Sequence, residues 1–189
     1  IVKRLASEGA KVAFTYVSNT EAAEAFASSI GPDAVAIKAD AADPAAVTAA
    51  VEKAADTFGK IDILVHNAGV FRPGPVTDFD FDAYRQQTAV NVDGVYAGTH
   101  AAVPHIPEGG RIIVISSFNA DRMPFEGFAA YGATKAAVTA LVKGWARDLG
   151  SRQILVNAIQ PGPIDTDMNP AAGPFFEPVS GMTALKRYG

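Results

Sequence analysis

Residues 131–149 read YGATKAAVTALVKGWARDL, a run whose apolar residues recur with the period of an α-helix. Because an α-helix turns by about 100° per residue, one narrow stripe of this run carries a tyrosine, a lysine and then four large apolar residues. The stripe consists of Tyr131, Lys135, Val138, Val142, Trp145 and Leu149. A lysine on a buried stripe is costly unless its charge has a use. We therefore predict a helix at about 128–149 that presents Tyr131 and Lys135 on its inward face.

The spacing of Tyr131 and Lys135 has a chemical interpretation. An isolated tyrosine titrates near ~10, and an ammonium held within a few ångströms favours the phenolate. Bringing the pKa to neutrality requires about 3 pH units, or about 4 kcal/mol. We predict that Lys135 lowers the pKa of Tyr131, so that this phenol exchanges protons near physiological pH. The alternative is a stacked tyrosine beside a lysine that extends to solvent, which the pair alone does not exclude.

Short β-rich runs alternate with helical segments along the rest of the chain. This alternation indicates right-handed βαβ units and a parallel sheet covered by helices on both faces. The predicted strands are 11–17, 34–39, 61–66, 111–116 and 154–159, and the predicted helices are 20–30, 44–58, 81–103 and 128–149. A chain of 189 residues with 49% hydrophobic content can bury a substantial core, so residues 1–189 are predicted to form one domain.

Unusual residues gather where the predicted strands end. In open α/β sheets, ligands bind beyond the carboxyl ends of the strands. The residues found there are Ser18-Asn19, Asp40, Asn67-Ala68-Gly69, Ser116-Ser117 and Pro161-Gly162. The sequence therefore predicts a ligand site at this edge of the sheet.

Composition argues against several classes of partner. The net charge of −4 and the scattered basic residues make nucleic acid and anionic membranes poor candidates. Cysteine is absent, and the three histidines lack ligand spacing, so no metal site is predicted. No apolar run is long enough to span a bilayer. The lack of cysteine fits a reducing compartment, and we predict a cytoplasmic protein.

The first residues, Ile1–Gly9, read as the last turns of an amphipathic helix that ends on glycine, with no N-cap ahead of it. We therefore expect the natural chain to begin before Ile1, which leaves a signal peptide upstream open.

Taken together, five motifs resemble the classical short-chain dehydrogenase/reductase family, in its branch of ketoacyl-carrier-protein reductases. Tyr-x-x-x-Lys alone is a weak motif, whereas all five in this order are specific, and the resemblance covers the whole chain. The motifs are Asn67-Ala68-Gly69, Asn91 in Asn-Val-x-Gly, Ser117 after a strand, Tyr131-x-x-x-Lys135, and Pro161-Gly162 leading to Thr166.

The resemblance implies a Rossmann-type, doubly wound parallel sheet in a three-layer α/β/α fold, with strand order 3-2-1-4-5-6-7. It places a first strand with a Gly-rich turn before Ile1, and a last strand after the visible chain. That first strand would lie between the runs at 11–17 and 61–66, so a chain beginning at Ile1 is expected not to fold normally. The Gly-rich turn is the usual cradle for the cofactor's pyrophosphate, so cofactor binding is expected of the longer chain.

The resemblance also implies four catalytic residues. Tyr131 would be the general acid/base that protonates a carbonyl oxygen, and Lys135 would lower its pKa and hold the cofactor's ribose hydroxyls. Ser117 would hydrogen-bond the substrate oxygen, although the neighbouring Ser116 stays an alternative. Asn91 would hold a water that relays protons to the lysine, and it can also be a satisfied structural amide.

For the cofactor, the resemblance implies contacts from the ends of the strands. Asp40 would bond the adenine ring, and the Asn67-Ala68-Gly69 turn would let the main chain approach the cofactor. Residues 16–19 contain no carboxylate for a ribose 2′-hydroxyl, so NADP(H) is favoured over NAD(H). The predicted cofactor residues are Ser18, Asn19, Asp40, Asn67, Ala68, Gly69, Tyr131, Lys135, Pro161, Gly162, Ile164 and Thr166.

The substrate is predicted to be a small ketone or secondary alcohol in an apolar pocket. The predicted pocket residues are Phe71, Phe118, Met123, Phe125 and Phe175. Carrier-protein reductases of the family tend to have basic residues before the fourth visible strand. Here the residues before that strand are Pro107-Glu108-Gly109-Gly110, and Arg111 is the only basic residue there. A free ketone is therefore preferred to a carrier-bound substrate.

Two alternatives and one assembly follow from the same residues. The alternatives are a 3-oxoacyl-carrier-protein reductase of fatty-acid synthesis and a non-catalytic, nucleotide-binding or regulatory protein of the same fold. A homotetramer or homodimer is predicted, because small residues in the two long helices allow close packing, although packing within one chain explains them equally. These residues are Gly94, Ala97, Gly98, Ala137 and Ala140.

Overall fold

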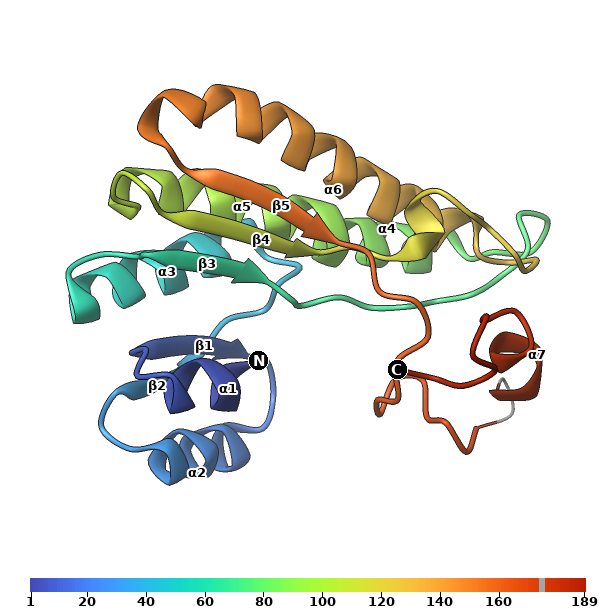
Figure 1. The fold of residues 1–189 in the computed structure, drawn as a ribbon, viewed down its shortest axis with the longest axis horizontal. Helices are drawn as coiled ribbons and strands as arrows, with labels where there is room; N and C mark the ends of the chain where they lie inside the picture. The colour runs from blue at the N-terminus through green and yellow to red at the C-terminus, as the bar shows by residue number, and fades with distance from the viewer. Residues whose placement is uncertain (174–175) are drawn as a thin grey trace.

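A computed structural model of the chain describes residues 1–173 and 176–189 (Figure 1). The helices are α1 (Val2–Ser7), α2 (Thr20–Ile30), α3 (Pro44–Phe58), α4 (Phe81–Thr88), α5 (Gly94–Ala102), α6 (Ala129–Asp148) and α7 (Phe176–Ser180). The strands are β1 (Val12–Tyr16), β2 (Ala34–Lys38), β3 (Ile63–His66), β4 (Arg111–Ile115) and β5 (Leu155–Ile159). The predicted alternation of strands and helices is confirmed.

The strands form two parallel ladders. In the first, β1 pairs with β2, with Val12 opposite Ala34. In the second, β4 lies between β3 and β5, so that Arg111 faces Ile63 on one side and Leu155 on the other. Among the described residues, no ladder joins β1 to β3. The carboxyl ends of β3, β4 and β5 therefore share one edge, as the sequence predicts.

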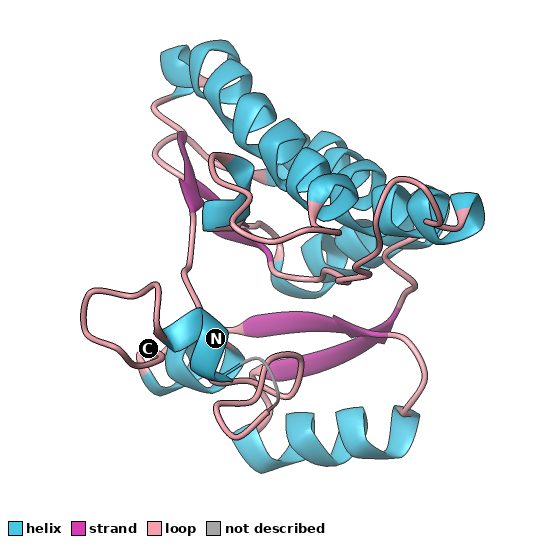
Figure 2. Cartoon of the chain, turned by 90° about the vertical axis from the view of Figure 1, so that its right-hand side faces the viewer, coloured by secondary structure: helices cyan, strands magenta, loops and turns pink. Residues whose placement is uncertain are grey.

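Helices pack on both faces of the β1–β2 ladder, and Figure 2 shows α2 along one of them. On one face, Phe14 of β1 meets Phe26 of α2 edge to face, with ring centroids 5.4 Å apart. On the other face, Ile37 and Ala39 at the end of β2 pack against Ala50 of α3. This half of the molecule has the predicted three layers.

The main core lies between α5, α6 and one face of the β3–β4–β5 ladder. Ile112 and Val114 of β4 are almost completely buried there. Full burial of such side chains contributes about 1.5–3 kcal/mol each. The opposite face of the ladder carries apolar residues that are about half exposed, at 44%, 51% and 49% for Ile63, Leu155 and Ile159. The core therefore packs α6 against one face of β4.

Two glycines of α5 permit close packing within the chain. A Cβ at Gly94 would overlap the carbonyl oxygen of Ala41, and a Cβ at Gly98 would lie 2.8 Å from Cε1 of His66. These contacts seat α5 against α3 and the end of β3. Gly94 and Gly98 therefore have an intramolecular reason to be small, and they give no support to an oligomer.

The predicted single helix over 81–103 is interrupted. Residues Ala89–Asp93 form a π-helical segment between α4 and α5, and Val103–His105 form a 3₁₀ turn. A π turn inserts an extra residue without changing the apolar pattern much, so helical periodicity does not reveal it. The segment carries Asn91 at its centre, and such bulges occur often at functional sites.

His66 joins the end of β3 to α5, because its Nε2 lies 2.8 Å from Oγ1 of Thr99. Burial lowers the pKa of His66 to about 4 from 6.5. Between pH 6.5 and 4 the unfolded chain binds more protons than the folded one, so stability falls as the pH falls through this window. We expect the free energy of unfolding to drop by about 3 kcal/mol from this residue by pH 4.

The comparison that isolates His66 is urea unfolding of the wild type and His66→Asn at pH 7.5, 5.5 and 4. The variant should lose less stability on acidification, because a carboxamide does not titrate. Equal losses in the two proteins would contradict the assignment.

Candidate active site

Tyr131 and Lys135 lie side by side on the first turns of α6. The Lys135 side chain is buried, with 6% of the residue exposed, and its Nζ donates a hydrogen bond to the carbonyl oxygen of Ile115 at 2.9 Å. The same Nζ lies 5.7 Å from the centroid of the Tyr131 ring. Because Ile115 is the last residue of β4, this bond fixes the ammonium at the carboxyl edge of the sheet.

The two serines after β4 have different partners. Ser116 Oγ donates to the carbonyl oxygen of Lys135 at 3.0 Å and lies 2.8 Å from Oγ1 of Thr139, so it ties β4 to α6. The Ser117 side chain interacts with the Tyr131 phenol and lowers its pKa. Its Oγ also lies 3.1 Å from Oδ1 of Asn119. Of the two serines that the sequence left open, Ser117 is therefore the one that faces the phenol.

The Asn91 carboxamide is surrounded by protein partners. Its Nδ2 donates to the carbonyl oxygen of Val70 and to Oγ1 of Thr134, both at 3.0 Å, and its Oδ1 accepts from the Val70 N–H at 2.9 Å. A Cβ at Gly69 would lie 3.4 Å from this Oδ1 and 3.5 Å from Nζ of Lys135. Asn91 therefore serves the structure, and it also stands beside the lysine and the Asn-Ala-Gly turn.

The predicted effect of Lys135 on Tyr131 is wrong for this structure. Burial raises the pKa of the Tyr131 phenol above its usual value, and the interaction with Ser117 offsets only part of the rise. Burial also lowers the pKa of Lys135 to about 8. The physical reason is that the ammonium donates to the Ile115 carbonyl rather than to the phenol, while both groups lose water. Tyr131 is thus a protonated donor at neutral pH.

Comparison with known proteins identifies the family of the chain. The family model described as enoyl-(acyl carrier protein) reductase matches residues 1–189. The chain belongs to the short-chain dehydrogenase/reductase family. Two curated relatives are a cyclic-di-GMP-binding biofilm dispersal mediator protein of Escherichia coli, 42% identical over 100% of this chain and 77% of that protein, and versicolorin reductase stcU of Emericella nidulans, 39% identical over 89% of this chain and 65% of that protein.

Solved structures agree with the assignment to the short-chain dehydrogenase/reductase family. A short-chain dehydrogenase/reductase of Serratia marcescens has a TM-score of 0.96 at 51% identity, with 100% of this chain and 78% of that chain covered. A short-chain dehydrogenase of Burkholderia cenocepacia, in complex with NADP, has a TM-score of 0.96 at 46% identity, over 99% of this chain and 78% of that chain. The Rossmann-type fold predicted from the sequence is therefore confirmed, and the chain is an oxidoreductase of this family.

Several predicted cofactor residues lie at the carboxyl edge of the strands. Asn67 and Ala68 are exposed, and Gly69 next to them faces the Lys135 ammonium. Pro161 is brought beside the Ser117 turn, because its carbonyl oxygen accepts from the Phe118 N–H at 3.1 Å. An exposed main-chain turn beside a buried ammonium fits a dinucleotide cofactor with ribose hydroxyls.

Other predicted cofactor residues have local structural roles. Asn19 caps α2 by accepting from the Ala22 N–H at 3.0 Å, and Asp40 accepts from the Ala42 N–H at 2.9 Å. Thr166 pairs with Asn169 in an isolated bridge. The remaining residues, Ser18, Gly162 and Ile164, lie in loops, with Ile164 42% exposed. The part of these residues in cofactor binding stays a prediction.

Aromatic rings gather beside the phenol. Phe71 meets Tyr131 and Phe128 edge to face, with ring centroids 5.0 and 4.9 Å away, and Phe125 lies 5.4 Å from Phe128. Met123 packs on the main chain at Gly132. Sequence reasoning missed Phe128, although a residue three positions before Tyr131 shares its side of the helix.

The other two predicted pocket residues stand apart from this cluster. Phe118 follows Ser117 and takes part in none of the ring contacts found among the described residues. Phe175 lies outside the described residues. Phe71 thus contacts the phenol ring, while Phe125 contacts Phe128 and Met123 packs at Gly132, and their role as a substrate pocket stays a prediction.

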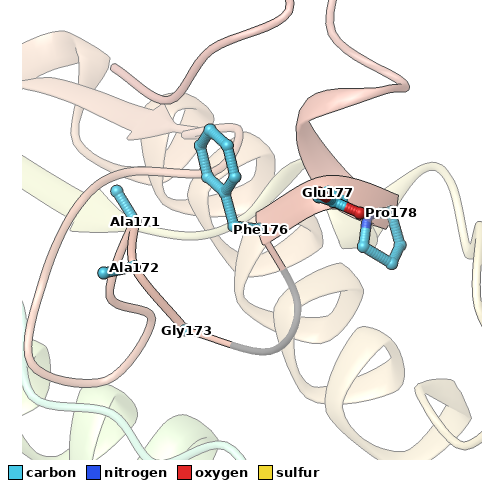
Figure 3. A pocket seen from close by; sticks show the side chains of 6 residues that line it. All are labelled: Ala171, Ala172, Gly173, Phe176, Glu177 and Pro178. Atoms are coloured by element: carbon cyan, nitrogen blue, oxygen red, sulfur yellow. The ribbon is translucent and has the colours of Figure 1, made fainter.

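A separate hollow of about 440 Å³ lies in the C-terminal part of the chain (Figure 3). It is lined by Ala171, Ala172, Gly173, Phe176, Glu177 and Pro178. None of these residues belongs to the elements that carry the site around Tyr131. Within 1–173 and 176–189, no cluster of three or more histidine or acidic side chains could hold a metal ion, and no helix has the length and apolarity to cross a membrane.

Proposed function

We propose that the protein transfers hydride between NADP(H) and a ketone or secondary alcohol, with Tyr131 as the general acid/base. The observation that carries the proposal is the position of Lys135 Nζ, which donates to the Ile115 carbonyl oxygen and lies 5.7 Å from the centroid of the Tyr131 ring, with Ser117 close enough to the phenol to lower its pKa. A hydroxyl donor, a phenol donor and a buried cation at one point suit a substrate oxygen that gains negative charge during the reaction.

The proposed roles follow from the contacts. Tyr131 gives its proton to the carbonyl oxygen, and its raised pKa keeps that proton in place at neutral pH. Ser117 donates a hydrogen bond to the same oxygen and holds the substrate in line with the phenol. Lys135 supplies a fixed positive charge, and Asn91 supports the loop beside it through Val70. When bound, the reduced nicotinamide supplies the hydride that adds to the carbonyl carbon.

The proposed cofactor is NADP(H), held by the Asn67-Ala68-Gly69 turn, Lys135 and the loop at Pro161-Gly162. Support for a phosphorylated cofactor comes from the end of β1, where residues 16–19 offer no carboxylate to a ribose 2′-hydroxyl. A preference over NAD(H) is tested by comparing kcat/KM for NADPH and NADH with the same ketone.

The proposed substrate is a free ketone or secondary alcohol with an apolar or aromatic group. The rings of Phe71, Phe125 and Phe128 beside Tyr131 favour such a group over a charged one. A carrier-bound 3-oxoacyl substrate stays the second choice, since residues 107–110 before β4 contain no basic side chain and Arg111 is the first residue of β4 itself. Comparing free with carrier-linked ketoesters distinguishes the two.

The activity itself is tested on the full-length protein by following NADPH absorbance with a panel of aliphatic and aryl ketones. We expect turnover with several ketones and a higher kcat/KM for aryl ketones than for acetone-sized ones. The physical reason is that the aromatic wall desolvates an apolar group. If none of the ketones or ketoesters led to oxidation of NADPH, the proposed activity would be wrong.

A second candidate function is nucleotide binding with little turnover. What favours it is the relative at 42% identity that is named a cyclic-di-GMP-binding mediator protein. Calorimetric titration with cyclic di-GMP, together with the ketone panel, decides between the two. Micromolar binding without turnover would favour the regulatory function, and turnover without binding would favour the enzyme.

A homotetramer or homodimer, a single domain over 1–189 and a cytoplasmic location also stay proposals. Gly94 and Gly98 give no support to association, but an aromatic patch does: Tyr96 on α5 is 54% exposed, and its ring centroid lies 6.1 Å from that of Trp145 on α6. Exposed aromatic side chains are enriched at interfaces. Light scattering on the full-length protein measures the assembly directly.

A further inference from the structure

Two side-chain amides face the chain segment that follows the Asn-Ala-Gly turn. Asn91 bonds both the N–H and the carbonyl oxygen of Val70, and Gln87 Oε1 accepts from the Arg72 N–H at 2.7 Å. The two amides are four residues apart, on the last turn of α4 and in the π-helical segment. Together they hold residues 70–72 as a neighbouring strand would.

The bonds reach residues 70 and 72, and the residue between them points elsewhere. Phe71 contacts the rings of Tyr131 and Phe128, at 5.0 and 4.9 Å between centroids. Because the main chain is bonded on both sides of Phe71, these bonds also restrict the direction in which its side chain points. The position of this ring beside the phenol thus depends on the amides behind it.

One of the two amides, that of Asn91, is also tied to the helix that carries the phenol. Asn91 Nδ2 donates to Oγ1 of Thr134, and that hydroxyl donates to the carbonyl oxygen of Tyr131 at 2.7 Å. The network therefore runs from α6 through Asn91 to the segment 70–72. It sets the separation between the Phe71 ring and Tyr131 from both sides.

Gln87 is costly to keep at this position. The residue is fully buried, and its Nε2 is the one buried side-chain polar atom without a hydrogen-bond partner among the described residues. Leaving a buried donor unpaired is unfavourable, and an apolar side chain of similar volume would avoid it. The single bond to Arg72 is then the contact that accounts for a glutamine.

We propose that Gln87 is a positioning residue that sets substrate selectivity, by holding Phe71 as a fixed wall beside Tyr131. The proposal rests on the proposed oxidoreductase function and adds a residue that touches neither substrate nor phenol. Without the bond to Arg72, residues 71 and 72 gain freedom and the wall becomes adjustable. Discrimination between bulky and small ketones then weakens, while the general acid stays in place.

The test compares Gln87→Met, which removes the acceptor at similar volume, with Gln87→Glu, which retains it. Gln86→Met is the matched control, because Gln86 is exposed and its side chain hydrogen-bonds only the Arg72 guanidinium among the described residues, at 3.3 Å. Hydrogen exchange of the Arg72 amide should speed up at least tenfold in Gln87→Met alone. The aryl-to-small-ketone ratio of kcat/KM should fall about tenfold in that variant and recover in Gln87→Glu, with the Kd for NADPH unchanged.

A double-mutant cycle with Phe71→Leu tests whether Gln87 affects selectivity through Phe71. If Gln87 acts through Phe71, Gln87→Met changes the selectivity of the Phe71→Leu protein by less than twofold. Equal loss of kcat/KM for all ketones, or unchanged exchange of the Arg72 amide, would overturn the inference. Wild-type protein without ketone turnover would instead remove the proposed function, and the exchange measurement would still report on the bond itself.

Discussion

Tyr131→Phe is expected to lower kcat/KM for ketone reduction by about 10²–10⁴-fold, the usual contribution of a positioned general acid. The variant keeps the ring and its edge-to-face contact with Phe71, and it loses only the hydroxyl next to Ser117. The measurement is steady-state NADPH oxidation with the best ketone of the panel. The Kd for NADPH, from fluorescence titration, should change by less than about threefold, since the ring and Lys135 are unchanged.

A suitable control is Tyr84→Phe, which removes a phenolic hydroxyl from a residue that is 40% exposed on α4. It should leave kcat/KM within about twofold, because surface substitutions away from special features have small effects. If Tyr131→Phe reduced ketones as fast as the wild type, another group would have to deliver the proton and the mechanism would be wrong.

The raised pKa of Tyr131 predicts which direction of the reaction is faster. A phenol that stays protonated at neutral pH is ready to donate, so ketone reduction needs no prior proton uptake. Alcohol oxidation requires the phenolate, which burial disfavours. Reduction should therefore be the faster direction near pH 7 with the free phenol as the donor.

The sequence predicted the fold well because its patterns are local. Alternating β-rich runs and capped helices mark the elements, and Asp43 accepts from the N–H groups of Ala45 and Ala46 at the start of α3, as the Asp-Pro pair indicates. The π-helical segment at 89–93 was missed for the opposite reason. A single wide turn is set by tertiary contacts of Asn91, and these leave no periodic signal.

The sequence predicted which residues come together at the site, but it did not predict the pKa shift of Tyr131. Tyr131, Lys135 and Ser117 do come together, since strand ends and a helix start meet at one edge of the sheet. The predicted direction of the pKa shift of Tyr131 was wrong. That direction depends on which acceptor the Lys135 ammonium bonds and on how much water Tyr131 and Lys135 lose on burial. Gln87 was missed because its partner is the main chain of a distant loop, although its place four residues before Asn91 was visible.

Lys135→Met is expected to lower kcat/KM by about 10²-fold or more, since it removes a fixed charge beside the developing negative oxygen. In the wild type, the pKa of about 8 means that the lysine loses its charge as the pH rises through 8. The kcat/KM for reduction should therefore fall above pH 8, and that limb should be absent from the residual activity of the variant. A profile unchanged by the substitution would contradict the role.

The same substitution has an opposite and separable effect on stability. The folded pKa of Lys135 is about 8 against the ordinary 10.5, so between these values the unfolded chain binds more protons and wild-type stability rises with pH. From pH 7.5 to 10 this residue should add about 2 kcal/mol to the free energy of unfolding, and Lys135→Met lacks that rise. Urea unfolding of both proteins at pH 7.5, 9 and 10 gives the difference. A parallel pH dependence would mean that the ammonium is solvated rather than held at Ile115, and a solvated charge could not serve the chemistry proposed for it.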